Sequence, residues 1–189
     1  EIQRISEAVD DDREAVQLHL GGGTPNALST DQLAQLMRQF ERCFRFAAPG
    51  QRDFSIEVDP RTVSEADVFE LQAMGCHNIN FVSPTHIVPQ ILAALFIAYE
   101  NGMNLPLVYN SSGYESLSTL ALLDGIIDIY MPDFKFWDPR TSDITCGAPD
   151  YPDAARKAVL EMHRQVGDLV IDASGQAKRG LLIRHLVMP

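Results

Sequence analysis

The sequence is poor in cysteine. Its three cysteines, Cys43, Cys76 and Cys146, lie far apart along the 189 residues, so no pair has the close spacing of a zinc knuckle or a redox motif. A sparse and odd-numbered set of cysteines is typical of a protein that stays in a reducing compartment. We therefore expect each cysteine to act as a small apolar residue and not as a metal ligand.

Basic residues and long apolar runs are also scarce. The 15 lysines and arginines are scattered among 26 acidic residues, and the net charge is −11, which argues against a nucleic-acid partner because such a surface needs clustered basic residues. The longest apolar run, residues 91–99, is much shorter than the roughly 20 residues that span a bilayer. The first residues lack the basic-then-apolar pattern of a signal peptide. We expect a cytoplasmic protein that binds neither nucleic acid nor membrane, and a homo-oligomer stays open.

What the sequence does have is a regular alternation of apolar runs and helical patterns. In one helical pattern, apolar residues recur at i, i+3, i+4 and i+7 from Leu33, behind Ser29 or Thr30 as the N-cap. The runs predict strands at 15–20, 54–58, 77–82, 107–110, 126–131 and 181–188, helices at 30–43, 64–74, 87–101, 116–123 and 152–166, and a small hairpin from 169–172 and 178–182.

Strands that alternate with helices through short connections are typically parallel and joined by right-handed crossovers. Six such units can form an open doubly wound sheet or a partial barrel, and we expect an α/β fold that is a partial (β/α)6 TIM-like barrel of parallel strands. With 46% hydrophobic residues the chain can bury one core. The sequence therefore predicts one domain over residues 1–189.

The residues that follow the predicted strands are polar. They are residues 21–24, Glu57 and Asp59, residues 83–86, residues 110–113, Asp133 and Lys135, and Arg184 and His185. Both architectures place ligand-binding residues at the carboxyl ends of parallel strands. We therefore expect residues 21–24, Glu57, Asn110, Asp133 and Lys135 to lie on one rim.

A run of glycines, Gly21-Gly22-Gly23-Thr24-Pro25, follows the first predicted strand. Glycine lets the backbone turn sharply and lets its amide groups approach a ligand that a side chain would keep away. Two interpretations stay open, a loop that binds a small polar molecule and a tight turn that needs positive φ.

Two pairs of charged residues stand two positions apart at strand ends, so both members of a pair point to the same side. Glu57 and Asp59 could bind a cation or an amine, or could form a solvated strand end. Asp133 and Lys135 could grip the two ends of a zwitterion, or could form a simple salt bridge. No Ser-Gly elbow indicates a nucleophilic triad, and no catalytic residue is assigned.

Two motifs in the first part of the chain carry a family resemblance. Residues 18–25 (LHLGGGTP) and 55–60 (SIEVDP) resemble the oxygen-independent coproporphyrinogen oxidase branch of the radical S-adenosylmethionine enzymes, over about residues 13–75. The resemblance implies that Gly22, Gly23 and Thr24 contact the amino-acid part of S-adenosylmethionine, and that Glu57 binds the same cofactor. It also implies a 4Fe-4S cluster in the complete family member.

From about residue 71 the likeness changes. Residues 75–86 (GCHNINFVSPTH), 108–114 (VYNSSGY), 128–135 (DIYMPDFK) and 184–189 (RHLVMP) resemble radical S-adenosylmethionine proteins similar to pyruvate formate-lyase activating enzyme. This resemblance implies that Asp133 and Lys135 bind the cofactor. It also implies a monovalent-cation site lined by Asn110, Ser111, Met131 and Asp133, with Asn110 in place of the family's aspartate.

The cluster loop that defines the superfamily, three cysteines spaced Cys-x3-Cys-x2-Cys after a first strand, is absent from this sequence, and so is that first strand. Thiolates must converge to hold an iron–sulfur cluster, and local spacing does not bring these cysteines together. Two hypotheses follow. One is the cofactor-binding barrel of a 4Fe-4S and S-adenosylmethionine-dependent oxidoreductase or activating enzyme, and the other is a non-catalytic, recombined or truncated scaffold domain without a cluster.

Overall fold

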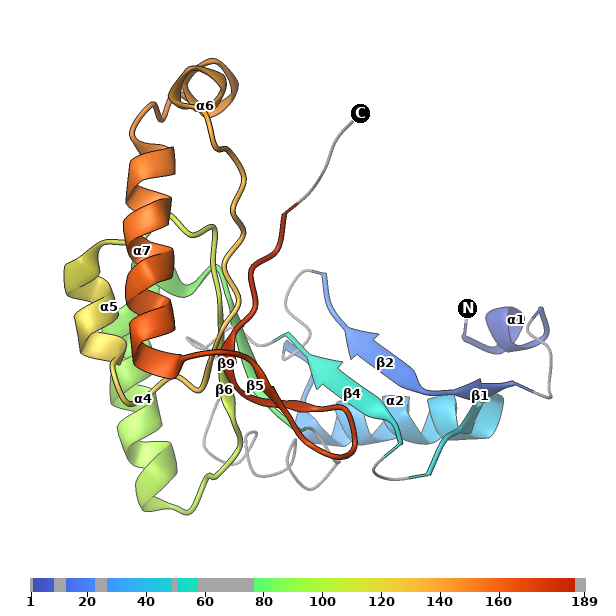
Figure 1. The fold of residues 1–189 in the computed structure, drawn as a ribbon. Helices are drawn as coiled ribbons and strands as arrows, with labels where there is room; N and C mark the ends of the chain where they lie inside the picture. The colour runs from blue at the N-terminus through green and yellow to red at the C-terminus, as the bar shows by residue number, and fades with distance from the viewer. Residues whose placement is uncertain (1, 9–12, 23–26, 49–50, 58–76, 186–189) are drawn as a thin grey trace. The chain divides into compact units, whose positions relative to one another are not determined.

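The computed structural model describes residues 2–8, 13–22, 27–48, 51–57 and 77–185 (Figure 1). The helix predicted at 64–74 lies outside these residues, as do Gly23, Thr24 and Asp59 of the predicted site. Contacts divide the chain into two compact units, Glu1–Ile79 with Ala94–Leu105 and Asn80–Ala93 with Pro106–Pro189. The single domain over residues 1–189 stays a prediction.

The first unit contains two pairs of parallel strands. β1 (Glu14–Ala15) pairs with β3 (Arg45–Phe46), and β2 (Gln17–Leu20) pairs with β4 (Asp53–Ile56). Leu20 stands opposite Ile56 in the second pair, so Gly21 and Glu57 follow the two strands at the same edge. Phe54 and Ile56 are buried, in agreement with the apolar run from which this strand was predicted.

The main helix of this unit is α2 (Thr30–Cys43), and α1 (Ile2–Ser6) is a single short turn near the start of the chain. The Ser29 hydroxyl accepts a hydrogen bond from the Gln32 amide, while the Gln32 side chain accepts one from the Ser29 amide. This reciprocal capping box satisfies two amides at the helix start, and it selects Ser29 over Thr30 as the N-cap. Leu33, on the apolar face, is buried.

The second unit is built on a five-stranded sheet in the order β5-β6-β7-β9-β8. Its strands are β5 (Ile79–Val82), β6 (Leu107–Asn110), β7 (Ile129–Tyr130), β8 (Val170–Ile171) and β9 (Ala177–Leu181). β6 pairs with β7 and β7 with β9 in parallel, whereas β8 and β9 are antiparallel. All four residues of β6 are buried, as expected for a strand inside a sheet with covered faces.

Helices lie between the strands of this sheet along the chain. They are α5 (Leu117–Leu123), α6 (Pro139–Cys146) and α7 (Tyr151–Val166), and α4 (Val88–Glu100), which follows a 3-10 turn at Pro84–Ile87, continues into the first unit. α5 and α7 lie side by side, and α7 packs on β7 and β9 (Figure 1). Tyr109 and Tyr130 from the sheet and Leu120 and Met162 from the helices have no exposed surface, so they form the core.

The α/β fold with parallel strands is confirmed, but the TIM-like barrel is not. Over the described residues the strands form three separate sheets of two, two and five strands. The second arm of the predicted hairpin is β9, which pairs with β7 on one side and β8 on the other. Of the sixth strand predicted at 181–188, Leu181 belongs to β9 and Arg184 forms an isolated bridge, while residues 186–188 lie outside the described residues. In the described part of the chain, no helix is long and apolar enough to cross a membrane.

α6 was not predicted from the sequence, because prolines flank that segment and suggest a loop. Pro139 instead occupies the first turn of the helix, where proline is favoured because its missing N–H costs no hydrogen bond. Asp138 caps the helix by accepting from the Thr141 amide, and Gly147 ends it with a φ of 65°.

Candidate functional site

The strand ends of the first unit bring the glycine loop and Glu57 together. The Gly22 amide donates to Oε2 of Glu57 at 3.2 Å, and Oε1 of Glu57 lies 3.4 Å from Nε2 of His19. The other imidazole nitrogen, Nδ1, is 2.9 Å from the Ser55 hydroxyl. The parallel register sets His19 opposite Ser55 and so aligns these contacts.

Gly21 and Gly22 are the two described glycines of this loop, and a different structural reason favours glycine at each position. A Cβ at Gly21 would lie 2.5 Å from Nε2 of His19, so glycine leaves room for the imidazole. Gly22 has a φ of 80°, which other residues rarely adopt, and its Cβ position faces open space. The positive-φ interpretation therefore holds for Gly22, and the open space leaves room for the ligand interpretation too.

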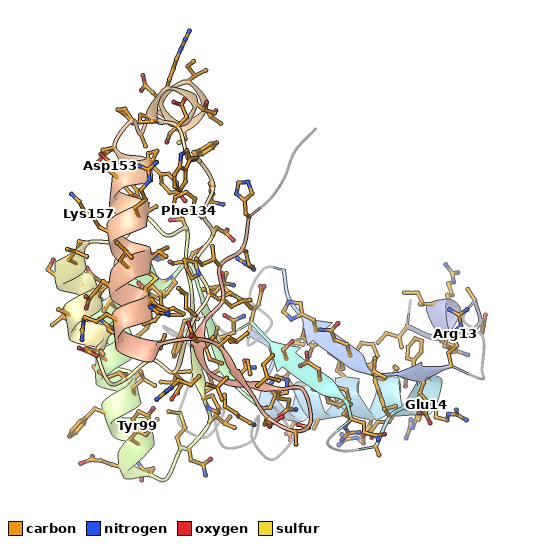
Figure 2. All side chains as sticks on the ribbon, in the orientation of Figure 1. Arg13, Glu14, Tyr99, Phe134, Asp153 and Lys157 are labelled. Carbon is orange, nitrogen blue, oxygen red and sulfur yellow. The ribbon has the colours of Figure 1, made fainter. Side chains whose placement is uncertain are left out.

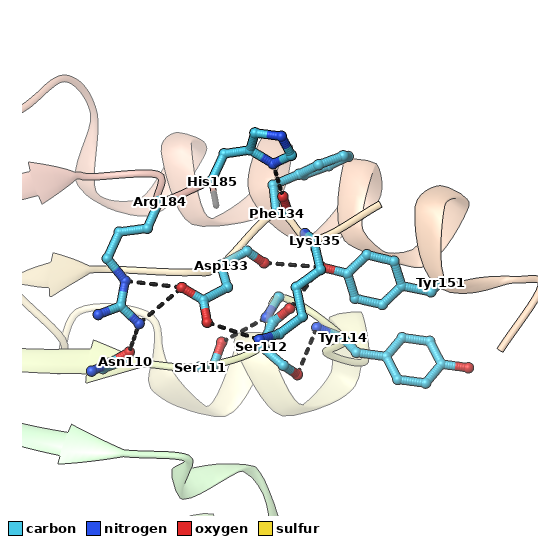
Figure 3. A network of polar contacts seen from close by, with 11 residues as sticks. Asn110, Ser111, Ser112, Tyr114, Asp133, Phe134, Lys135, Tyr151, Arg184 and His185 are labelled. Carbon is cyan, nitrogen blue, oxygen red and sulfur yellow. Dashed lines mark hydrogen bonds and ion pairs between the residues drawn. The ribbon is translucent and has the colours of Figure 1, made fainter. Parts of the chain in front are cut away.

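The strand ends of the second unit gather a charged cluster around Asp133 (Figure 3). Nζ of Lys135 lies 3.1 Å from one carboxylate oxygen of Asp133. The Arg184 guanidinium contacts the other oxygen through Nε and Nη2, both at 2.9 Å. Nη2 of Arg184 also donates to the Asn110 side-chain oxygen at 2.7 Å. One carboxylate is thus shared between two cations, and the guanidinium links the ends of β6, β7 and β9.

Backbone pairing continues past the ends of the strands at this cluster. The Asp133 amide donates to the Ser111 carbonyl at 2.8 Å, the Phe134 amide to the Arg184 carbonyl at 2.8 Å, and the Arg184 amide to the Pro132 carbonyl at 2.9 Å. Asp133 and Arg184 form an additional parallel bridge. The segment that carries the Asp133 and Lys135 side chains is therefore fixed on both sides.

Sequence reasoning put Asp133 and Lys135 together, and the structure does bring them together. No role for Arg184 was predicted from the sequence, where it was noted only as a polar residue after the last strand. The signal that could have found it was its position after the last predicted strand, at the end expected to lie on the same rim as Asp133.

The hypothetical monovalent-cation site involves two of the same oxygens. Asn110 and Asp133 both accept from Arg184, Ser111 accepts from the Gly113 amide through its hydroxyl, and Met131 is half-buried. The guanidinium therefore already donates to an oxygen of two of the proposed ligands, and Lys135 and Arg184 balance the charge of Asp133. The cation site stays a prediction. Across the described residues, no group of three His, Cys, Asp or Glu side chains is arranged to hold a metal.

Aromatic side chains flank the cluster on the loop after β7. Figure 2 shows Phe134 beside α7, the helix that carries Asp153 and Lys157 on its outer face. The Phe134 ring centroid lies 5.8 Å from that of Trp137, and the Arg156 guanidinium stacks over Trp137 at 4.2 Å. Trp137 remains 72% exposed, so the aromatic groups border the cluster without closing over it.

A second polar group missed by sequence reasoning is Glu115, which is buried behind the end of β6. Its carboxyl group accepts hydrogen bonds from the Thr85 hydroxyl at 2.5 Å and the Tyr109 hydroxyl at 3.3 Å. Burial raises the pKa of Glu115 above its ordinary value, although the surrounding hydroxyls oppose the shift. Glu115 thus ties the loop after β5 to the loop after β6.

Comparisons with known proteins relate this chain to oxygen-independent coproporphyrinogen III oxidases. No family model matches the chain. The Escherichia coli enzyme of that name is 42% identical over 69 residues, which are 36% of this chain and 14% of the enzyme. An uncharacterized protein of Methanocaldococcus jannaschii is 32% identical over 114 residues, which are 59% of this chain and 29% of that protein.

The solved structure of Escherichia coli coproporphyrinogen III oxidase, described as a radical SAM enzyme, is similar with a TM-score of 0.54 and 20% identity. The match covers 91% of this chain and 51% of the enzyme. The chain therefore spans less than a third of the curated relatives it matches and about half of the solved enzyme. The structural match shows a similar fold, and the sequence match shows a stretch similar to coproporphyrinogen III oxidases. The likeness to pyruvate formate-lyase activating enzyme stays a prediction.

Proposed function

We propose that this chain is a radical SAM-type domain that binds S-adenosylmethionine, the cofactor-binding part of an oxidoreductase or activating enzyme. The observation that carries the proposal is the pair Asp133 and Lys135, whose opposite charges are held 3.1 Å apart at the carboxyl end of β7. The amino-acid part of S-adenosylmethionine carries one ammonium and one carboxylate. Asp133 suits the ammonium and Lys135 the carboxylate, since charge-assisted hydrogen bonds are the strongest that side chains offer.

The glycine loop supplies a second group for the same ligand class. Gly22 has open space at its Cβ position, and its neighbour Glu57 offers a half-buried carboxylate to an amine. Gly23 and Thr24, in the part of the chain outside the described residues, belong to the same proposed set. Each group, within its own unit, could bind the amino-acid part of S-adenosylmethionine. Forming a radical from this cofactor also takes one electron from a reductant, and we assign these residues binding only.

The residues do not fit a 4Fe-4S cluster. Cys43 is half-buried on α2, and the thiol of Cys146 donates to the Ser142 carbonyl at 3.0 Å. The chain also lacks three closely spaced cysteines. This mismatch favours a second candidate function, a scaffold domain that retains the fold without turnover, and we derive no reaction step through a cluster.

Titration calorimetry with S-adenosylmethionine tests the binding proposal. We expect a Kd weaker than about 1 μM, because the cofactor in complete family members is also ligated by cluster iron. Methylthioadenosine, which lacks the amino-acid part, should bind more weakly still. No heat of binding at millimolar S-adenosylmethionine, or equal affinity for both compounds, would refute the proposed function.

Two substitutions with matched controls locate the site. Lys135→Gln should weaken binding about tenfold, which corresponds to about 1.4 kcal/mol, whereas Lys178→Gln should not, although Lys178 forms a similar surface pair with Asp172 at 3.2 Å. Gly22→Val should also weaken binding. Its control is Gly102→Val, because Gly102 has a φ of 90° and equally open surroundings, so both variants carry the same backbone strain. Equal effects of Gly22→Val and Gly102→Val on affinity would remove the glycine loop from the site.

A further inference from the structure

Tyr151 is buried at the first residue of α7, with 4% of its surface exposed. Its ring lies among aromatic neighbours, with centroids 5.6 Å from Tyr114, 5.8 Å from Phe136 and 6.4 Å from Phe134. Burial raises the pKa of the Tyr151 hydroxyl, so it keeps its proton. The packed ring holds this protonated hydroxyl at a fixed point beside the charged cluster.

Three backbone groups surround that hydroxyl (Figure 3). It accepts from the Lys135 amide at 2.8 Å. The carbonyl oxygens of Ser112 and Asp133 lie at 2.8 Å and 2.9 Å, within reach of its proton. One hydroxyl can accept and donate at the same time, so a single oxygen satisfies backbone groups from two loops.

The Tyr151 hydroxyl takes the place that the next residue of β6 would occupy if that strand continued. In an extended chain, alternate residues direct their amide and carbonyl groups to the same side. The Asp133 amide pairs with the Ser111 carbonyl on the β6 side, and beyond Ser111 the backbone pairing of β6 stops. The Asp133 carbonyl and the Lys135 amide point to that side too, and both meet Tyr151.

The opposite side of the segment is paired with the chain after β9. There the Phe134 amide donates to the Arg184 carbonyl, and the Phe134 carbonyl accepts from Nδ1 of His185. Without the Tyr151 hydroxyl, the Asp133 carbonyl and the Lys135 amide would each lose the hydrogen bond to it. These groups are part-buried, and a backbone group that loses its partner away from water is costly, so we expect the segment to turn out of its extended conformation.

We propose that Tyr151 is a positioning residue that extends the edge of β6 by one hydroxyl group and thereby keeps Asp133 and Lys135 on the same side of the strand. Its role in ligand binding rests on the proposed function, because the extended conformation is what aims both charged side chains at one zwitterion. Its role in holding the segment does not depend on any ligand.

The variant Tyr151→Phe tests this, since it keeps the ring and removes only the hydroxyl. The matched control is Tyr130→Phe, because Tyr130 is also fully buried and its hydroxyl donates to Gln165 at 2.6 Å, outside the cluster. Residue-resolved amide hydrogen exchange by NMR reads the outcome. We expect the Lys135 amide to exchange at least about tenfold faster in Tyr151→Phe and unchanged in Tyr130→Phe. If the Lys135 amide exchanges at the same rate in folded Tyr151→Phe as in the unchanged protein, the proposal is overturned.

A measurement on the unchanged protein covers the case in which Tyr151→Phe does not fold. There the Lys135 amide should exchange as slowly as the Phe134 amide, and exchange at the rate of a free amide would overturn the proposal. S-adenosylmethionine titration is the second readout, with binding weakened about tenfold by Tyr151→Phe and not by Tyr130→Phe. If the unchanged protein binds no S-adenosylmethionine but Tyr151→Phe exposes the Lys135 amide, the proposed function fails and the positioning role of Tyr151 stands.

Discussion

At the scale of single residues, the effect of a charge depends on how much water surrounds it. The side chains of Asp133, Lys135 and Arg184 are 29%, 49% and 46% exposed, so their ion pairs contribute little to stability. These ion pairs instead orient the Asp133 carboxylate, because Nζ of Lys135 and Nε and Nη2 of Arg184 hold it in place. Glu115 differs, since only 5% of its surface is exposed and the hydroxyl groups of Thr85, Ser111 and Tyr109 stabilise its ionised form.

Glu115 should make stability depend on pH. Its pKa is raised in the folded protein, so its contribution is fully present below the ordinary glutamate pKa and is lost as the pH rises through the raised value. Glu115→Gln removes this titration. We expect the free energy of unfolding of the unchanged protein, relative to the variant, to fall between about pH 4 and pH 8, by about 1.4 kcal/mol for each unit of pKa shift. Urea denaturation at both pH values measures it, and a difference that does not change with pH would contradict the expectation.

At the scale of helices and strands, caps decide where elements begin. α2 starts at a capping box formed by two side chains three residues apart, and α6 starts at Asp138, which accepts from the Thr141 amide. Both signals are local and readable in the sequence. The first was recognised because an apolar helical pattern follows it. The second was missed because prolines flank α6 and suggest a loop, and because no apolar residue of this helix is buried to mark a pattern.

Removing the α2 cap should therefore have a defined cost. We expect Ser29→Ala to lower the free energy of unfolding by about 1 kcal/mol, because the Gln32 amide loses its acceptor. Gln35→Ala, at an exposed position within the same helix, is the control and should cost nothing, since alanine is the better helix former. Chemical denaturation of both variants is the measurement, and equal stabilities of the two would show that the capping box does not stabilise α2.

At the scale of the whole molecule, the chain has two compact units, each with parallel strands and polar groups at their carboxyl ends. Its fold resembles half of a solved coproporphyrinogen III oxidase. At 20% identity this resemblance shows the fold alone, and the sequence has no three closely spaced cysteines of a cluster loop. The two candidate functions differ at this scale, because turnover by the first would need iron, whereas a scaffold domain would not.

Iron content separates these functions. After anaerobic reconstitution with iron and sulfide, we expect a colourless protein with far fewer than about four irons per chain, because three widely spaced cysteines do not form the local ligand set of a cluster. The measurement is iron and sulfide analysis together with the visible absorption spectrum. A brown protein with stoichiometric iron and sulfide would contradict this expectation and favour the catalytic hypothesis.

The sequence by itself determined most elements and part of the site. Helix 30–43 and strand 107–110 have the predicted bounds, and the hairpin at 169–182 forms, because hydrophobic periodicity and caps act over a few residues. The same local reach explains Asp133 and Lys135, whose spacing of two sets both side chains on one side of an extended chain.

Only the tertiary structure decided what holds that pair in place. Arg184 is 51 residues from Asp133 along the chain, and Tyr151 is 16 residues from Lys135, so no local pattern could assign their contacts. They meet because β9 pairs with β7 and α7 packs against both. The arrangement of the strands in sheets was likewise beyond the sequence, since strand–helix alternation predicts parallel pairing but leaves open whether the sheet closes. Pairing between distant strands depends on long-range packing, which no local spacing encodes.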